Sequence, residues 1–187
     1  NESMQTEIDE LVSNGTWEWV TRDWAKHNHP TTRTIPTRWV YRIKETATGH
    51  VSRFKSRLVA AAWRKDPNPD YTLSYVPVLR YVSKRCMLAT AAHKRWKCYC
   101  YDIKNAYVLA PLKPGQVFVL EQAPGMTKRG PNGEDMVLFL KKGLYGLVPS
   151  GRNFSDYLNA RLVDKNGLNL TRSKIDASVY YNDSMTI

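Results

Sequence analysis

Two neighbouring stretches decide the fold: Trp39-Val-Tyr-Arg-Ile-Lys44 and, after the turn signal Thr48-Gly49, Arg53-Phe-Lys-Ser-Arg-Leu58. Apolar and cationic side chains alternate along both of them. The apolar set is Trp39, Tyr41, Ile43, Phe54 and Leu58, and the cationic set is Arg42, Lys44, Arg53, Lys55 and Arg57. Because successive side chains of a strand point to opposite faces, this period of two predicts a β-hairpin with one apolar and one cationic face.

The predicted hairpin concentrates the positive charge of the chain. The 187 residues contain 28 Lys and Arg against 17 Asp and Glu, a net charge of +11. Residues 33 to 65 hold nine Lys and Arg (positions 33, 38, 42, 44, 53, 55, 57, 64 and 65) and a single acid, Glu45. This balance favours a polyanionic partner and binding that weakens with salt. The alternative is a solvated edge hairpin whose cations only keep it soluble and unpaired.

Three segments around the hairpin have apolar residues at helical spacing. Their apolar positions are Met4, Ile8, Leu11 and Val12; Val82, Cys86, Ala89, Ala92 and Trp96; and Phe154, Tyr157, Leu158 and Leu162. They predict a short N-terminal helix, a helix ending near Arg95, and a helix over residues 150 to 165. Residues 21 to 36 are polar, contain two prolines, and are expected to form a loop.

Strands are predicted between these helices. Residues 98 to 103, 117 to 120 and 136 to 140 are short apolar or aromatic runs, and two more short strands are expected around Asp176. A basic hairpin followed by strands that alternate with helices predicts an α+β fold, with an antiparallel sheet and helices packed on one face.

Composition excludes several classes of protein. The three cysteines, Cys86, Cys98 and Cys100, fit neither a disulfide framework nor a zinc module. No apolar run approaches the ~20 residues that a membrane span needs, and the acidic first ten residues do not form a signal peptide. We therefore expect an intracellular, cytoplasmic protein without a membrane partner.

Asp102 is the main candidate for chemistry. It follows the aromatic run Cys98-Tyr-Cys-Tyr101 and precedes a turn, so its carboxylate is expected at the end of a strand. A carboxylate in that position can hold a divalent metal together with substrate phosphates. The alternative is an aspartate that only forms the turn or caps a helix.

A succession of short motifs covers nearly the whole chain. In order they are Asn14-Gly-Thr-Trp17, Trp39-Val-Tyr-Arg-Ile-Lys44, Lys55-Ser-Arg-Leu-Val-Ala60, Asp70-Tyr71, Pro77-Val78, Asp102-Ile-Lys-Asn-Ala-Tyr107, Gln122-Ala-Pro-Gly125, Leu144-Tyr-Gly-Leu147 and Asp176-Ala-Ser178. This order resembles the reverse transcriptase domain of copia-type LTR retrotransposons, an RNA-directed DNA polymerase within a Gag-Pol polyprotein.

The resemblance implies a right-hand polymerase fragment and a role for each matched residue. Asp102 and the carbonyl of Ile103 would bind Mg²⁺, with Asp102 as the catalytic carboxylate. Tyr107 would act as the steric gate against a 2′-hydroxyl. Lys55 and Arg57, with Lys44 behind them, would bind the dNTP triphosphate, because arginine can bind two phosphate oxygens at once.

The same resemblance divides the chain and supplies its partners. Residues 1 to 36 would be an N-terminal helix and loop, 37 to 97 the fingers hairpin with its following helix, and 98 to 187 a partial palm. The implied partners are an RNA or DNA template-primer, dNTP and the remainder of the Pol polyprotein, within a virus-like particle for an intact element.

The chain departs from the family pattern at two places that concern catalysis. The Tyr-x-Asp-Asp motif, which would supply two more metal-binding carboxylates, is not in the sequence; Tyr181-Asn-Asp-Ser184 ends on serine and is expected to be a hairpin turn. Val148-Pro149 stands where the family usually has Lys-Gln, and proline offers no side-chain hydrogen bond. We therefore expect this chain alone not to polymerise. The alternative function is a non-catalytic, decayed or co-opted nucleic-acid-binding module.

Overall fold

The computed structural model describes residues 2–62 and 75–184 of the chain. Trp63, Lys65, the Asp70-Tyr71 motif and Met185-Thr-Ile187 lie outside the described residues. The described segments form three sheets and five helices, and the helices lie on more than one side of the largest sheet. The fold is therefore mixed α and β, as expected, but it is not a single antiparallel sheet.

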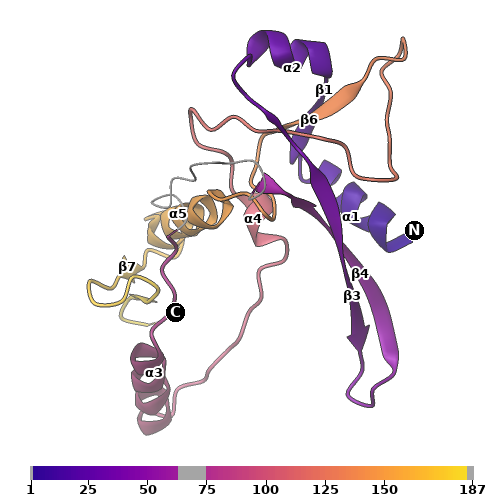
Figure 1. Ribbon diagram of the computed structural model, residues 1–187. Helices are drawn as coiled ribbons and strands as arrows, with labels where there is room; N and C mark the ends of the chain where they lie inside the picture. Colours follow the sequence, from indigo (N-terminus) through magenta and orange to yellow (C-terminus); the bar gives the residue numbers. More distant parts are fainter. Residues whose placement is uncertain (1, 63–74, 185–187) are drawn as a thin grey trace.

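The predicted basic hairpin is confirmed. Strand β3 (Thr37–Glu45) pairs with β4 (Val51–Ala60) in an antiparallel register that places Trp39 opposite Leu58 and Ile43 opposite Phe54. The amide of Gly49 donates to the carbonyl of Thr46 at 3.0 Å and closes the turn. Figure 1 shows the hairpin as a long ribbon whose tip extends away from the other elements.

Only the base of the hairpin is buried. Helix α1 (Glu2–Ser13) packs on β4, where Ser3 and Ser56 share a hydroxyl hydrogen bond of 2.7 Å and Glu7 accepts from the amide of Leu58 at 3.3 Å. Leu58 is fully buried, whereas Phe54, two pairs nearer the tip on the same face, is 66% exposed. The apolar face is therefore covered near the body and open near the tip.

The main sheet has the order β1-β6-β5-β2. Strand β1 (Trp17–Thr21) pairs antiparallel with β6 (Met136–Leu140), β6 pairs antiparallel with β5 (Val119–Leu120), and β5 pairs in parallel with β2 (Thr34–Ile35). One face contributes Trp17, Leu120, Leu138 and Leu140 to a core shared with Leu11 of α1 and Leu58 of β4. The sheet thus supports the base of the hairpin.

The segment 21 to 36, expected as a loop, contains a helix and a strand. Helix α2 (Arg22–Asn28) begins where the Thr21 hydroxyl accepts a hydrogen bond from the Trp24 amide at 3.1 Å, an N-cap that the polar composition concealed. Ala25 of this helix packs on Val119 and Val137, on the face of the sheet opposite to α1. Helices therefore cover both faces of the main sheet, not one.

The apolar stripe predicted after Pro77 is not a core. Helix α3 (Tyr81–His93) forms as expected, but Val82 is 71% exposed and the helix buries only Ala91 among the residues the structure describes. Residues 98 to 103, expected as a strand, have no regular secondary structure, and Tyr101 is 84% exposed. Figure 1 shows α3 apart from the main body, joined by this connection to α4 (Ala106–Leu109). A strand needs a neighbour for its hydrogen bonds, and no described strand lies beside this segment.

The C-terminal elements form a small unit beside α4 (Ala106–Leu109). Helix α5 (Ser150–Val163) confirms the helix expected at 150 to 165, and β7 (Thr171–Arg172) pairs with β8 (Tyr180–Tyr181) around Asp176. Leu162, Leu170 and Tyr180 form its core.

Candidate functional site

Besides Arg38 near the base, five cations share one face of the hairpin. The register places Arg42 opposite Lys55 and Lys44 opposite Arg53, with Arg57 two residues beyond Lys55 on the same strand face. In the part of the chain that the structure describes, none of the five forms an ion pair with a carboxylate. Lys44 and Lys55, predicted to act together, therefore do lie on one surface.

The arrangement of these charges opposes folding. Like charges directly opposite each other on a sheet are destabilising. Burial, together with the charges of Arg57 and Arg53, lowers the pKa of Lys55. An anion placed on this face would relieve the repulsion, so the surface is suited to bind phosphate groups.

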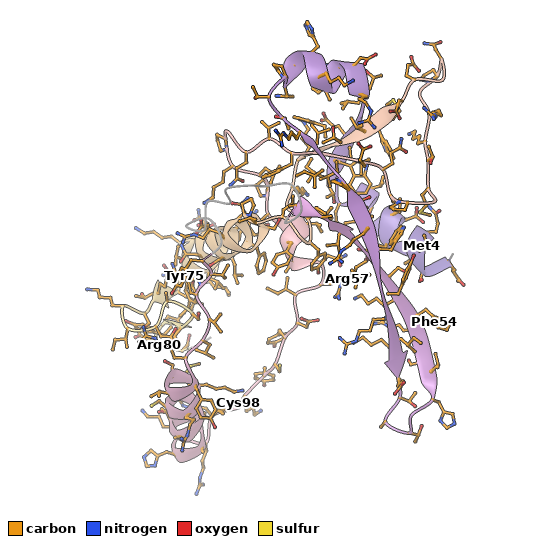
Figure 2. The ribbon with its side chains drawn as sticks, in the orientation of Figure 1. Met4, Phe54, Arg57, Tyr75, Arg80 and Cys98 are labelled. Carbon is orange, nitrogen blue, oxygen red and sulfur yellow. The ribbon has the colours of Figure 1, made fainter. Side chains whose placement is uncertain are left out.

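The body end of the cationic face meets a cluster of aromatic rings. The Arg57 guanidinium lies over the ring of Tyr145, 5.1 Å from its centroid. The Tyr145 ring contacts the Tyr107 ring edge-on at 5.0 Å, and Tyr107 also contacts Phe154 of α5 at 6.4 Å. In Figure 2, Arg57 lies on the side of the hairpin toward α4, whereas Met4 and Phe54 lie on the other side. Arg57 and Tyr107, 50 residues apart, are thus linked through a third side chain.

The turn from residue 143 to 147 joins the hairpin to the Tyr107 segment. The amide of Ala60 donates to the carbonyl of Tyr145 at 2.8 Å, and the amide of Gly143 donates to the carbonyl of Ala110 at 3.0 Å. A Cβ at Gly146 would lie 2.1 Å from the carbonyl oxygen of Ala60, and one at Gly143 would lie 2.7 Å from that of Tyr107. Glycine at both positions permits this close approach of three backbone segments.

The predicted metal-binding residues lie on an exposed segment just before the turn at Lys104 and Asn105. Asp102 is exposed and Ile103 is 42% exposed. The turn is attached to α1 through Glu10, which accepts from the Lys104 ammonium at 2.6 Å and from the Asn105 amide at 2.8 Å. These two hydrogen bonds lower the pKa of the Glu10 carboxyl. Asn105 adopts a left-handed conformation with φ of 53°, which lets the chain turn into α4.

The donor set for a metal is incomplete. Asp102 offers a carboxylate, and Ile103 could add its carbonyl, but the described ranges 2–62 and 75–184 contain no cluster of three or more His, Cys, Asp or Glu that could hold an ion. Divalent metals in polymerase-type sites require one or two carboxylates plus substrate phosphates. The described residues fit only part of such a site.

Asp176, a motif residue with no predicted role, ties two parts of the chain together. Its carboxylate accepts hydrogen bonds from the backbone amides of Arg80, just before α3, and of Ser178, both at 3.0 Å. Hydrogen bonds from the Ser83 hydroxyl and from these amides lower the pKa of Asp176. The aspartate therefore holds the start of α3 against the C-terminal unit.

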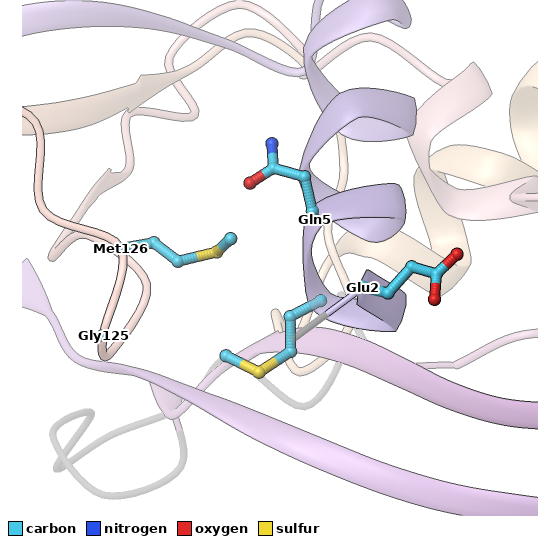
Figure 3. A pocket seen from close by; sticks show the side chains of 5 residues that line it. Glu2, Gln5, Gly125 and Met126 are labelled. Carbon is cyan, nitrogen blue, oxygen red and sulfur yellow. The ribbon is translucent and has the colours of Figure 1, made fainter.

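A shallow pocket lies on the opposite side of the hairpin base. Its volume is about 330 Å³, and its lining includes Met4. Figure 3 shows Glu2, Gln5, Gly125 and Met126 around it. The lining contains no cation, and Met4 accepts a weak hydrogen bond from the Tyr41 hydroxyl at 3.7 Å. This pocket is chemically unsuited to a phosphate, so the candidate site is the cationic face with its aromatic end.

Of the three side chains that contact one another here, the sequence analysis named Arg57 and Tyr107 but not Tyr145. The sequence did contain a signal for Tyr145, because it belongs to the matched motif Leu144-Tyr-Gly-Leu147. The structure brings Arg57, Tyr145 and Tyr107 together, with Lys44 and Lys55 on the adjoining face. It places Asp102 and Ile103 on the separate segment described above.

Comparison with known proteins identifies relatives across most of the chain. Residues 16–184 match the family described as Reverse transcriptase (RNA-dependent DNA polymerase). The Retrovirus-related Pol polyprotein from transposon RE1 of Arabidopsis thaliana is 31% identical over 80% of this chain, and that from transposon RE2 of the same plant is 29% identical over 81%. That from transposon TNT 1-94 of Nicotiana tabacum is 28% identical over 81%.

These matches cover a small part of the relatives. The chain spans about a tenth of the length of the curated relatives it matches, 10% of the RE1 and RE2 polyproteins and 11% of the TNT 1-94 polyprotein. No solved structure matches the chain. Among the described helices, none is long and apolar enough to cross a bilayer.

Proposed function

The chain belongs to the reverse transcriptase (RNA-dependent DNA polymerase) family of copia-type retrotransposons, and we propose that its intact parent protein performs templated nucleotidyl transfer with two Mg²⁺ ions. In this proposal residues 37 to 97 belong to the fingers and 98 to 187 to part of the palm. The partners are an RNA or DNA template-primer, dNTP and the remainder of the Pol polyprotein, in the cytoplasm or in a virus-like particle.

One observation carries the proposal for this chain: a cationic face without carboxylate partners among the described residues ends on the aromatic cluster that contains Tyr107. A triphosphate needs cations beside its oxygens, and a sugar needs a flat surface beside its ring. We assign Lys44, Lys55 and Arg57 to the triphosphate and Tyr107 to the sugar. The linked positions of Arg57 and Tyr107 support one site for both parts of a nucleotide.

Asp102 is the proposed catalytic carboxylate and, with the Ile103 carbonyl, a proposed Mg²⁺ ligand. Mg²⁺ bound there would neutralise charge on the triphosphate and on the leaving group. Because the sequence holds no Tyr-x-Asp-Asp motif and Asp102 has no described carboxylate cluster around it, we propose that residues 1 to 187 bind substrates without polymerising them. Templated extension of a primer by this chain in Mg²⁺ and dNTP would contradict that part of the proposal.

Binding of a labelled template-primer and of a dNTP tests the function. The Lys55→Ala/Arg57→Ala variant should weaken both, and the slope of log affinity against log salt for the duplex should fall by about two, roughly 0.9 for each phosphate that the variant no longer neutralises. Lys165→Ala/Lys174→Ala, which removes two exposed cations outside the site, is the matched control and should leave dNTP binding unchanged.

The alternative, a non-catalytic nucleic-acid-binding module, predicts a different pattern. Both functions require the cationic face for nucleic acid, but only a polymerase site requires Asp102 for nucleotide. Weaker dNTP binding by Asp102→Asn in Mg²⁺ would therefore support the polymerase site. If Asp102→Asn leaves dNTP binding unchanged while Lys55→Ala/Arg57→Ala abolishes duplex binding, the binding module is correct.

A further inference from the structure

Tyr145 lies between two residues that the proposed function places on the same nucleotide. Its ring centroid is 5.1 Å from the Arg57 guanidinium carbon, which lies over the ring, and 5.0 Å from the Tyr107 centroid, at an interplanar angle of 65°. Each of the three residues comes from a different element or turn. The ring is therefore the physical link between the hairpin and the segment that follows Asp102.

The backbone fixes the position of this ring from both sides. The Tyr145 carbonyl accepts the Ala60 amide at 2.8 Å, so the residue is attached to the end of β4, only three positions from Arg57. On the other side, the Cα of Gly143 approaches the Tyr107 carbonyl so closely that an added Cβ would lie 2.7 Å from its oxygen. The backbone at Tyr145 cannot shift away from the end of β4 without breaking its hydrogen bond to Ala60.

The electrostatic environment suits a neutral ring beside a cation. A tyrosine phenol is uncharged at neutral pH, and burial raises the pKa of Tyr145 further above its ordinary value. A guanidinium is attracted to the negative face of such a ring. Unlike a carboxylate, the ring orients Arg57 without neutralising its charge, which remains available to an anion on the cationic face.

We propose that Tyr145 is a positioning residue of the nucleotide site: it holds Arg57 and Tyr107 at a fixed separation, so that a nucleoside triphosphate meets both at once. This inference rests on the proposed function of the cationic face. The ligand class is a nucleoside triphosphate, because inorganic triphosphate would contact the cations without reaching Tyr107. Tyr145 therefore favours the nucleotide over its triphosphate portion alone.

The test compares Tyr145→Phe with Tyr145→Leu in the full chain, using dTTP and inorganic triphosphate as probes in calorimetric titrations. Phenylalanine keeps the ring and should keep dTTP affinity within about threefold. Leucine should weaken it about tenfold, because without the ring Arg57 and Tyr107 are no longer held at one separation and dTTP cannot meet both at once. Inorganic triphosphate should bind both variants nearly equally. The control is Tyr157→Leu, which removes a similar pair, Arg161 over Tyr157 at 5.3 Å, from α5.

Each outcome has a separate meaning. If wild-type chain binds neither probe, the proposed function of the cationic face is wrong, and the role of Tyr145 falls with it. If wild type binds dTTP but Tyr145→Leu binds it equally well, or if Tyr145→Phe loses as much affinity as Tyr145→Leu, the positioning role is wrong while the function stands.

A measurement on the unmodified chain covers the case in which Tyr145→Leu does not fold. Nuclear magnetic resonance titration with dTTP should shift the Arg57 Nε–H signal and the ring signals of Tyr107 and Tyr145 along one saturation curve, while Tyr157 stays unchanged. Inorganic triphosphate should shift Arg57 without the same change at Tyr107. Ring signals that do not respond to dTTP while Arg57 does would overturn the proposal.

Discussion

Gly146 lies where the turn from residue 143 to 147 crosses the end of β4. Its φ of +86° is in the left-handed region, and an added Cβ would lie 2.1 Å from the Ala60 carbonyl oxygen and 2.7 Å from Val59 Cγ1. A side chain here meets two separate penalties. The first is the backbone conformation, roughly 1–2 kcal/mol for a residue with a Cβ, and the second is overpacking, roughly 1–3 kcal/mol.

Gly146→Ala should therefore lower the free energy of unfolding by roughly 2–5 kcal/mol, the sum of these two penalties. Gly133→Ala is the matched control, because Gly133 has a similar φ of +84° but no atom within 4 Å of an added Cβ. Urea unfolding followed by circular dichroism measures both variants. Equal losses of stability for the two would show that the close approach to Ala60 contributes nothing.

Individual site residues differ in how far the sequence reveals them. Lys55 and Arg57 follow from alternation alone, because a strand period of two fixes which side chains share a face. Tyr145 does not, since its role depends on the meeting of β4, the 143 to 147 turn and Tyr107, which are distant in sequence. Glu7 gave no signal either: it belongs to an amphipathic helix, yet it is buried and accepts the Leu58 amide.

The β3–β4 hairpin combines a regular pairing register with a face on which like charges repel each other. Lys44 and Arg53 are a directly opposed cross-strand pair, and opposite charges at such a pair contribute roughly 0.2–1 kcal/mol relative to a neutral pair. A hairpin whose cations serve only solubility would gain stability from a charge reversal at no loss of function. A phosphate-binding hairpin would gain stability and lose affinity.

Lys44→Glu should accordingly slow hydrogen exchange of the hairpin amides between residues 41 and 44 while weakening dTTP and template-primer binding severalfold. Lys174→Glu, at an exposed position beside Asp176, gives the same change in net charge and should do neither. Unchanged affinity in Lys44→Glu would favour the solvated edge hairpin. Faster exchange would show that the like charges do not repel each other in the folded chain.

Helices and strands were predictable where their formation depends on the local sequence. They were not predictable where it depends on packing or pairing with segments distant in the sequence. The hairpin, α1, α3 and α5 follow from periodicity and turn residues. The exposure of α3 could not be predicted from its sequence. An apolar stripe shows that a helix has a face able to pack, but it does not show which other element, if any, lies against that face. The expected strand at 98 to 103 differs for the same reason: its aromatic composition suits a sheet, but pairing requires an adjacent strand.

Carboxylates join segments of the chain that are distant in sequence. Glu10 holds the turn after Asp102 against α1, and Asp176 holds the start of α3 against the C-terminal unit. In a third contact, Arg22 donates to Glu121 and Asp135 at 2.7–2.9 Å and ties α2 to the main sheet. The arrangement of the chain therefore depends on ionised acids as well as on its apolar core.

The stability of the chain should depend on pH in opposite ways through Glu10 and through Glu7. Hydrogen bonds from Lys104 and Asn105 lower the pKa of Glu10, so its stabilising effect is complete above the unfolded value of 4.5 and is lost as the pH falls through the folded value. Burial raises the pKa of Glu7, so ionising it opposes folding, and the penalty develops as the pH rises above 4.5. Glu10→Gln should therefore lower the melting temperature at pH 7, and Glu7→Gln, which keeps an acceptor for the Leu58 amide, should raise it.

The difference in melting temperature between each variant and wild type should shrink as the pH falls, because the wild-type carboxyl is then protonated and neutral like glutamine. This should occur by about pH 4 for Glu7→Gln and at lower pH for Glu10→Gln. Thermal unfolding between pH 3 and pH 7 at constant ionic strength measures them. A Glu7→Gln variant that is less stable than wild type at pH 7 would mean that attraction to Lys55 and Arg57 outweighs the burial of the carboxylate. In that case Glu7 would be a counter-charge of the cationic face, and the face would be less available to a triphosphate than its other contacts indicate.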